Sequence, residues 1–334
     1  MSLHEALGGI LETQVIWEDL EKQLRTALQT NATFGPAKNV IDIGEGNGFA
    51  SRCGLVSCDW KGAEESEKLP CSVVIKIPSA LPFKQMNVIQ GDSAMWAGME
   101  TKLRELHNIE IASYKYFEVF DGLKMPKMYY GKEFTNENQL EGQISLEYVK
   151  NSRVMNFYEA HTVEQVKQIA RALGKIQACS LKKDVTAPEF DVNMHADFSK
   201  TVSLECTHFG VGVQDLLRIS LFALPAKERR ESAAMLVEEM YNSMVENLDG
   251  AEPPYSLEKL QSIYDILFPH SASYFAGGGI VIMIKQMNNA KLTMDMKELR
   301  KAVQMDKVLG ALEDILQYHS QNKELVKDLK FRDH

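Results

Sequence analysis

Three glycines and one lysine form the pattern in this chain with the clearest chemical meaning. Gly44, Gly46 and Gly48 occupy alternate positions in one short segment, and Lys76 follows inside an apolar run. Glycine lets backbone N–H groups approach an anion closely and adopt positive φ angles without strain. A glycine-rich turn between two strands, with a lysine on the next strand, is an arrangement that holds nucleotide phosphates. The spacing therefore predicts a nucleotide site at these four residues.

The same glycine segment also resembles the first motif of methyltransferases that use S-adenosylmethionine. That motif needs a helix after the glycines and then a second strand that ends in an acidic residue. Only ten residues separate Gly48 from Asp59, and residues 51–58 alternate without helical periodicity. The hairpin of a kinase-type phosphate cradle is therefore favoured, and the methyltransferase remains a minor alternative.

Lys76 has apolar neighbours on both sides, so a buried ammonium group there needs a carboxylate partner. The helix predicted over 99–120 offers Glu105 and Glu110. We predict that Glu110, one turn before Tyr114, pairs with Lys76 and directs its ammonium toward the α- and β-phosphates.

A strand predicted over 143–149 follows this helix, and its end is a candidate nucleotide hinge. The backbone of Glu147 to Val149 could hydrogen-bond the edge of an adenine there, and the alternative is an ordinary edge strand.

The order of predicted elements indicates an α+β fold with two lobes. Strands and two helices come first, and only helices follow, which divides the chain into 1–150 and 151–334. The predicted elements are a helix over 1–30, two strands within 40–56, a strand over 71–77, the helix over 99–120, strands over 127–130 and 143–149, and helices over 163–178, 216–224, 226–248, 257–267 and 296–319.

Composition excludes several classes of partner. The net charge of −9 lacks the basic surplus that nucleic-acid binders need. The five cysteines have neither Cys-x-x-Cys spacing nor nearby histidine pairs, so neither disulfides nor a metal site is expected. The N-terminus does not have the pattern of a signal peptide, and the apolar segment 274–284 is broken by three glycines. We therefore expect a cytoplasmic protein without membrane partners.

Several short sequence motifs, taken in order, are similar to those of the CHK-kinase-like proteins of nematodes and insects, relatives of choline, ecdysteroid and aminoglycoside kinases. The resemblance implies a protein-kinase-like fold that uses ATP and Mg²⁺ to phosphorylate a hydroxyl group of a small molecule. The similar motifs are Val15–Leu20, Ala32–Pro36, Ile43–Arg52, His107–Glu110, Leu146–Val149, His208–Gly210, Gln214–Arg218, Pro254–Leu260 and Phe268–Pro269.

The chain departs from the family pattern where catalysis is expected. The family has a His-Gly-Asp-Leu-Trp-x-x-Asn loop, and the best candidate here places Asp197 as the base but Val202 at the metal-binding asparagine. Ser203 occupies the position of the aspartate that holds magnesium. The two motifs are also too close together, so a central block of the helical lobe is predicted to be missing.

Asp215 fits the family better, as an aspartate at the head of a helix that supports the catalytic loop, with Arg218 one turn on. Its alternative role is a helix N-cap. A degenerate, pseudokinase-like protein that retains the ATP cradle is favoured for this chain. The alternative is an active MgATP-dependent kinase for a choline-, steroid- or xenobiotic-like hydroxyl.

Overall fold

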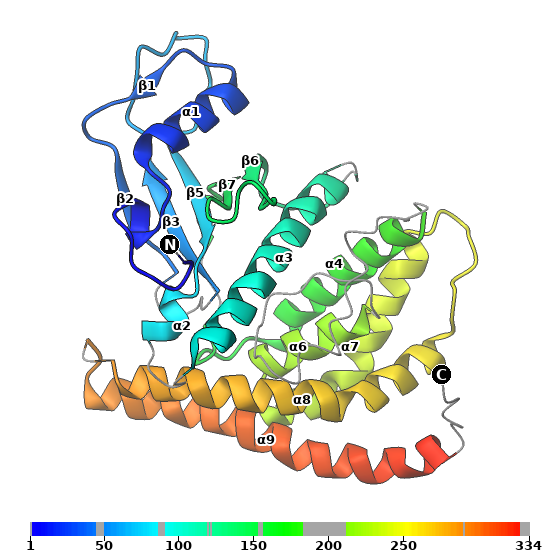
Figure 1. The fold of residues 1–334 in the computed structure, drawn as a ribbon. Helices are drawn as coiled ribbons and strands as arrows, with labels where there is room; N and C mark the ends of the chain where they lie inside the picture. Colours follow the sequence, from blue (N-terminus) through cyan, green and yellow to red (C-terminus); the bar gives the residue numbers. More distant parts are fainter. Residues whose placement is uncertain are drawn as a thin grey trace. The chain divides into compact units, whose positions relative to one another are not determined.

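The computed structural model describes residues 2–44, 50–85, 91–118, 120, 122–152, 156–182, 212–289 and 291–327 (Figure 1). These residues form two compact units, one that ends at residue 152 and one that begins at residue 156. The first unit contains all the described strands, and the second is helical. The predicted α+β class, with a β-rich first part and a helical second part, is confirmed.

The first unit is built on a five-stranded antiparallel sheet. Its order is β2-β3-β5-β7-β6, so the lysine strand β5 lies at the centre. The short strands β1 and β4 form a separate antiparallel pair. The bounds are β1 Thr33–Phe34, β2 Asn39–Asp42, β3 Ser51–Ser57, β4 Trp60–Lys61, β5 Ser72–Pro78, β6 Met128–Lys132 and β7 Gln143–Glu147.

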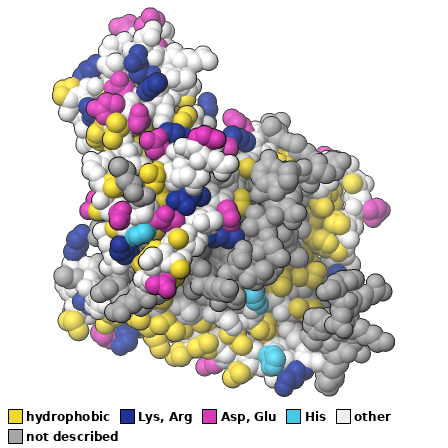
Figure 2. Space-filling model, in the orientation of Figure 1, with side chains coloured by type: hydrophobic (Ala, Val, Ile, Leu, Met, Phe, Trp, Pro, Cys, Tyr) yellow, Lys and Arg dark blue, Asp and Glu magenta, His cyan; other side chains and the backbone are white. Residues whose placement is uncertain are grey.

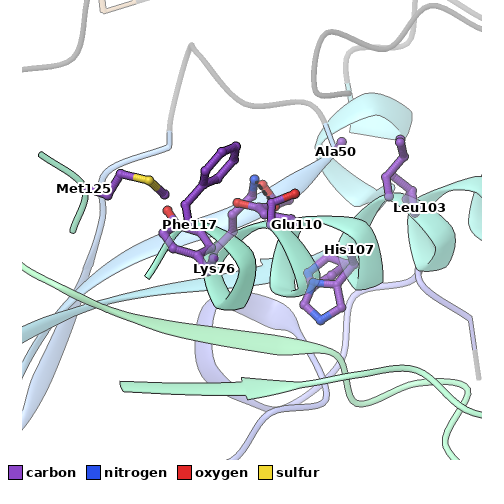
Figure 3. Close-up of a pocket in the computed structure, with 12 residues that line it drawn as sticks. Ala50, Lys76, Leu103, His107, Glu110, Phe117 and Met125 are labelled. Carbon is purple, nitrogen blue, oxygen red and sulfur yellow. Dashed lines mark hydrogen bonds and ion pairs between the residues drawn. The ribbon is translucent and has the colours of Figure 1, made fainter. Parts of the chain in front are cut away.

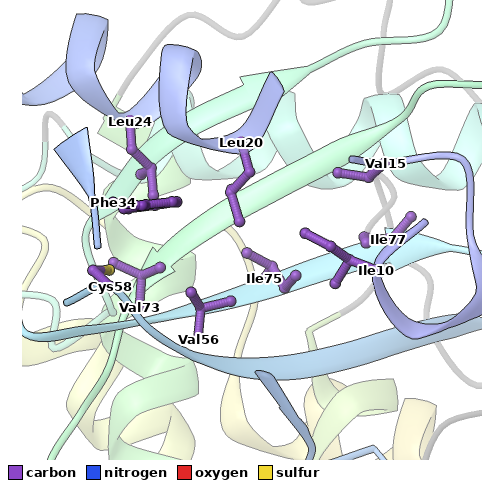
Figure 4. Packing of buried hydrophobic residues seen from close by; sticks show 10 residues of the cluster. All are labelled: Ile10, Val15, Leu20, Leu24, Phe34, Val56, Cys58, Val73, Ile75 and Ile77. Carbon is purple, nitrogen blue, oxygen red and sulfur yellow. The ribbon is translucent and has the colours of Figure 1, made fainter. Parts of the chain in front are cut away.

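Helix α1 (Trp17–Leu28) covers one face of this sheet. Alternate residues of β5 point to that face, because side chains of a strand alternate between its two sides. Val73, Ile75 and Ile77 are fully buried there, with Leu20 and Leu24 of α1 (Figure 4). This cluster fixes the register of the central strand.

The N-terminal helix is shorter than predicted. The expected helix over 1–30 is confirmed only for α1, and the residues before it form a 3-10 turn, η1 (Ile10–Glu12). Leu11 and Glu12 have φ angles of 53° and 63°, which a right-handed helix does not allow. The apolar spacing of the first fifteen residues reflects packing of this turn against the sheet.

Helix α3 (Ser93–Phe117) belongs to the opposite face of the sheet, after the short helix α2 (Leu81–Gln85). Asp92 caps α3 by accepting a hydrogen bond from the amide of Met95 at 2.8 Å. Ile111 of α3 packs in one buried cluster with Val74 of β5 and Ile144 of β7. The face of β5 that carries Val74 and Lys76 is therefore turned toward α3.

The second unit consists of five described helices. Thr162 and Gln165 form a capping box before the first, since the backbone amide of each donates to the side chain of the other (2.9 and 3.2 Å). The helices are α4 Val163–Lys182, α6 Val213–Ala223, α7 Ala226–Glu246, α8 Leu257–Met287 and α9 Met294–Lys327.

Close approaches and buried charges hold these helices together. A Cβ at Gly174 of α4 would lie 2.2 Å from the carbonyl oxygen of Met240 in α7, so only glycine fits at this crossing. Arg229 of α7 pairs with Asp314 of α9 at 2.6 Å, and both side chains are buried. Lys307 of α9 is also buried, and its ammonium donates to three backbone carbonyl oxygens at 2.6–3.0 Å.

Helix α8 corrects the prediction of an interrupted apolar segment. The three glycines at 277–279 lie inside a continuous helix of 31 residues, far beyond the predicted end at 267. By length and composition, Leu257–Ile284 is the one helix in the described part of the chain that could cross a membrane, with a mean hydropathy of 1.3. A buried core helix of a soluble protein meets the same criterion, and 44% of this window is buried.

Candidate functional site

Lys76 and Glu110 form an ion pair in the first unit, with 2.7 Å between Nζ and Oε2. Both side chains are largely withdrawn from solvent, with 16% and 28% of their surface exposed. A charged hydrogen bond in such surroundings fixes the direction of the ammonium more firmly than one in water.

The position of this pair follows from the sheet register and the helix period. Lys76 lies opposite Cys53 of β3 and Ile144 of β7, in the middle of the sheet and on the face turned toward α3. Glu110 is the carboxylate of α3 that reaches it. The other candidate, Glu105, pairs with Lys102 at 2.9 Å on the exposed side of the helix.

The ion pair lies in the wall of a cavity of about 320 Å³ (Figure 3). One wall comes from β3 and β5, and the other comes from α3. The lining residues of α3 recur every three or four positions, so they lie on a single face of the helix. A volume of this size is at the lower end of the range for small-molecule sites. The lining residues are Ala50, Ser51, Lys76, Pro78, Leu103, Leu106, His107, Glu110, Ser113, Tyr114, Phe117 and Met125.

His107 is a neutral imidazole in this wall. It is 3% exposed, and its Nε2 donates to the carbonyl oxygen of Lys132 at 2.8 Å. Burial lowers the pKa of His107 to about 4, and the positive charge of Lys76 acts in the same direction. Because Nε2 carries the single ring proton, Nδ1 is an acceptor, and within the described part of the chain it has no hydrogen-bond partner.

Tyr114 lies one turn beyond Glu110 and lines the same cavity. Burial raises the pKa of its phenol, and the nearby Glu110 carboxylate raises it further. The phenol is therefore a hydrogen-bond donor at neutral pH. The cavity thus offers a cation, a carboxylate, a neutral imidazole and a phenol among apolar side chains.

The glycine segment connects two strands that pair with each other. β2 and β3 pair antiparallel from Asn39 opposite Ser57 to Asp42 opposite Gly54, and β3 already begins at Ser51. A strand therefore follows the glycines, where a methyltransferase motif requires a helix. Of the predicted cradle glycines, Gly46 and Gly48 lie outside the described residues.

Gly44 is described, and its amide is occupied. The amide donates to Oδ1 of Asp42 at 2.8 Å, so Asp42 uses the donor that was predicted to meet a phosphate. A Cβ at Gly44 would lie 3.2 Å from the Cβ of Cys53. The role of Gly44 here is tight packing at the hairpin base.

The predicted hinge residues lie at the end of β7. The amide of Glu147 donates to the carbonyl oxygen of Lys127 at 2.8 Å, so this donor is not available to a base. Val149 follows the strand end and is 43% exposed. Within the described residues its amide makes no hydrogen bond, which leaves it as a donor that an adenine could use.

The predicted catalytic residues are only partly described. Asp197 lies outside the described residues, and so do Val202 and Ser203. Asp215 lies in the first turn of α6, but the N-cap position is Gly212, so the alternative role of Asp215 as an N-cap is wrong. Its support of the catalytic loop stays a prediction, because that loop lies outside the described residues. The carboxylate of Asp215 is 3.7 Å from the guanidinium of Arg218 and adds negative charge at a helix N-terminus.

The sequence interpretation missed His107, Ser51 and Met125 as lining residues, and it gave Leu103, Leu106 and Phe117 no place in the site. Their helical spacing with Glu110 was the available signal, because residues on one helix face share whatever that face contacts. Among the described residues, no cluster of three or more histidine, cysteine, aspartate or glutamate side chains could hold a metal ion.

Comparisons with known proteins give one family match. The model of the family DUF1679, described as "Uncharacterized oxidoreductase dhs-27", matches residues 3–206 and 189–323. No curated protein matches the chain. One solved structure, described as "a putative aminoglycoside phosphotransferase" from Ralstonia eutropha JMP134, covers 90% of this chain and 98% of its own at 11% identity, with a TM-score of 0.36. A score this low supports no argument about the site.

Proposed function

The chain belongs to the DUF1679 family, and from its site we propose that it is a kinase-like protein that binds ATP beside Lys76 and Glu110. The observation that carries the proposal is the 2.7 Å ion pair between the central strand and α3, in the wall of a cavity of about 320 Å³. A lysine held by a helix carboxylate is the device with which kinases contact the α- and β-phosphates. The same geometry supports the proposed relationship to CHK-kinase-like proteins.

The family description names an oxidoreductase, but no feature of the described site favours that chemistry. Dinucleotide sites of dehydrogenases use parallel strands and a glycine turn that opens a helix. Here the described strands are antiparallel, and the segment that begins at Gly44 leads to β3.

In the proposed complex, Glu110 keeps the ammonium of Lys76 pointed at the phosphates. The carbonyl of Glu147 and the amide of Val149 would bind the adenine edge. Because the ion pair is partly buried, fewer water molecules screen the ammonium of Lys76. This strengthens the attraction between that ammonium and a phosphate.

We propose that phosphoryl transfer is weak or absent, as in a pseudokinase. The sequence has Val202 and Ser203 where the family motifs have metal ligands, and transfer needs metal ions to neutralise the developing charge. The family match also breaks into two segments, which overlap at 189–206, where the catalytic loop is expected. The alternative is an active MgATP-dependent kinase with Asp197 as base and a small-molecule alcohol as acceptor.

The proposed location is the cytoplasm, where ATP is abundant. The described cysteines form no disulfide, in keeping with a reducing compartment.

Thermal unfolding with added ligands tests this function. A ligand that binds the folded state raises Tm, and a concentration of 100 Kd adds about 2.7 kcal/mol of stability. We expect ATP to raise Tm by a few degrees with or without Mg²⁺. A rise that requires Mg²⁺, together with ATP consumption in the presence of an alcohol, would favour the active kinase. No rise with ATP, or a rise only with S-adenosylmethionine or NADH, contradicts the proposal.

A further inference from the structure

The two longest helices of the second unit form an antiparallel hairpin. α8 and α9 are joined by residues 288–293, and near this loop Gln304 donates to Gln286 at 3.0 Å. Farther from the loop, the rings of Phe268 and Tyr318 stack at 4.3 Å. The pairs run in opposite directions along the two helices, so the helices remain in contact over most of their length.

The loop end of this hairpin, residues 280–301, is called the hairpin tip. It exposes large apolar side chains from both helices, where a soluble surface would place polar ones. Figure 2 shows hydrophobic side chains gathered where Figure 1 places α8 and α9. The exposed apolar residues of the tip are Ile280, Ile284, Met294, Met296 and Leu299, of which Met294 and Leu299 are 65% and 70% exposed.

The hairpin tip is also basic in an acidic protein. Its 22 residues include five basic side chains against two acidic ones, a formal charge of +3, whereas the whole chain carries −9 and the remainder therefore −12. The guanidinium of Arg300 lies 3.8 Å from the ring centre of Tyr158, and Lys301 lies 3.8 Å from Glu298. The basic residues are Lys285, Lys291, Lys297, Arg300 and Lys301, and the acidic ones are Asp295 and Glu298.

We propose that the hairpin tip docks on an anionic lipid surface. Transfer of isoleucine, methionine and leucine side chains to the boundary of the acyl chains lowers the free energy. Lysine and arginine side chains remain at the headgroups. The tip presents both kinds of side chain at one end of a helical hairpin. The positive charge of the tip attracts anionic lipid headgroups. The negatively charged remainder of the chain would be repelled by the same headgroups, so the tip is the part that faces the lipid.

The docking is peripheral. α8 contributes buried residues from Leu260 through Phe268 to Ile282, so packing against the other helices of its unit anchors it along its length. The tip differs from the exposed apolar residues farther along α9, such as Leu316, in its concentration of basic side chains. This proposal is independent of the ATP site, and it replaces the sequence-based expectation that no membrane partner exists.

A second copy of the chain fits the tip less well. Two copies related by a two-fold axis present the same surface to each other, so a basic tip would meet its own like charge. The structure thus favours a partner that combines negative charge with an apolar interior, as an anionic lipid surface does.

Sedimentation with lipid vesicles tests the proposal on the full chain. We expect binding to vesicles of phosphatidylcholine with 30% phosphatidylserine, little binding to pure phosphatidylcholine, and weaker binding at high salt. Leu299→Glu should reduce the bound fraction severalfold. Leu316→Glu is the matched control, because Leu316 lies far from the tip on the same helix and is equally exposed (71%).

Charge reversal at the tip gives a second, independent measure. Lys291→Glu should weaken binding to anionic vesicles about tenfold. Lys227→Glu on α7, a lysine that is 79% exposed, should leave binding unchanged. No binding to anionic vesicles, equal binding to neutral ones, or equal losses from Leu299→Glu and Leu316→Glu would overturn the proposal. A dimer in light scattering that Leu299→Glu dissolves would overturn it as well.

Discussion

Lys76 and Glu110 are 34 positions apart in the chain, yet Nζ and Oε2 are 2.7 Å apart. Lys76 lies on the central strand β5 and Glu110 lies on helix α3, which packs against that strand's face of the sheet. Because the pair lines a cavity, its charges are directed at whatever occupies that space. The contact links the fold to the proposed nucleotide site.

Glu110→Gln should weaken ATP binding about tenfold. The amide keeps the size of the carboxylate but removes its charge, and a hydrogen bond to a charged group is worth about 1.5–3 kcal/mol. Isothermal titration with ATP would measure the effect. Glu105→Gln is the control, because Glu105 pairs with Lys102 on the exposed side of α3. Equal affinities in the two variants would count against the pairing role of Glu110.

Stability should fall as the pH decreases from about 6.5 to about 4, because of His107. Burial lowers its pKa to about 4 in the folded protein, whereas an imidazole in the unfolded chain has a pKa near 6.5. Between these values the unfolded state binds more protons, so acid favours unfolding, by about 3 kcal/mol in total.

Urea unfolding at several pH values would measure this loss for His107→Gln and for the exposed control His319→Gln. The first variant should have a shallower pH dependence between 4 and 6.5, and the second should match the wild type. A wild-type slope in His107→Gln would show that other groups cause the acid instability.

Asp314→Ala should destabilise the protein by about 3–5 kcal/mol. Arg229 is 1% exposed, and removing its partner leaves a buried charge without compensation. The neighbouring residue provides a control, since Glu313 pairs with Arg230 at the surface and is 69% exposed. Glu313→Ala should cost less than about 1 kcal/mol. Denaturant midpoints that shift equally would refute the distinction.

Gly174→Ala should destabilise the helical unit by at least about 1–3 kcal/mol, because its methyl group would overlap the carbonyl oxygen of Met240. Gly277→Ala on α8 should instead stabilise the protein by about 0.5–1 kcal/mol. Nothing lies within 4 Å of a Cβ at Gly277, and alanine favours the helix. Urea unfolding of both variants decides whether these opposite signs hold.

The sequence was sufficient to predict the sheet around Lys76. The apolar run of β5 and the period of α3 are strong local signals. β5 lies within one residue of its predicted bounds, whereas α3 begins six residues before its predicted start. The Lys76–Glu110 pair was predictable because a lysine among apolar residues needs a carboxylate. Glu110 was preferred to Glu105 for its position one turn before Tyr114.

Other features depend on packing that local patterns do not encode. The glycines of α8 indicate a break, yet a Cβ at Gly279 would lie only 2.9 Å from the ring of Phe157, so this glycine permits close helix contact. The first fifteen residues have helical spacing but pack as a turn. The apolar residues Leu103, Leu106 and Phe117 recur at helical spacing on α3, which indicates a core face, and only the structure places a cavity beside them.

The affinity of Lys76→Ala for ATP tests the central claim most directly. Isothermal titration would compare this variant with Lys115→Ala, which removes a lysine from the exposed side of α3 (58% exposed, paired with Glu133). If Lys76 contacts the phosphates, its variant loses measurable ATP binding while Lys115→Ala keeps the wild-type Kd. An unchanged Kd in Lys76→Ala would contradict the proposed nucleotide site.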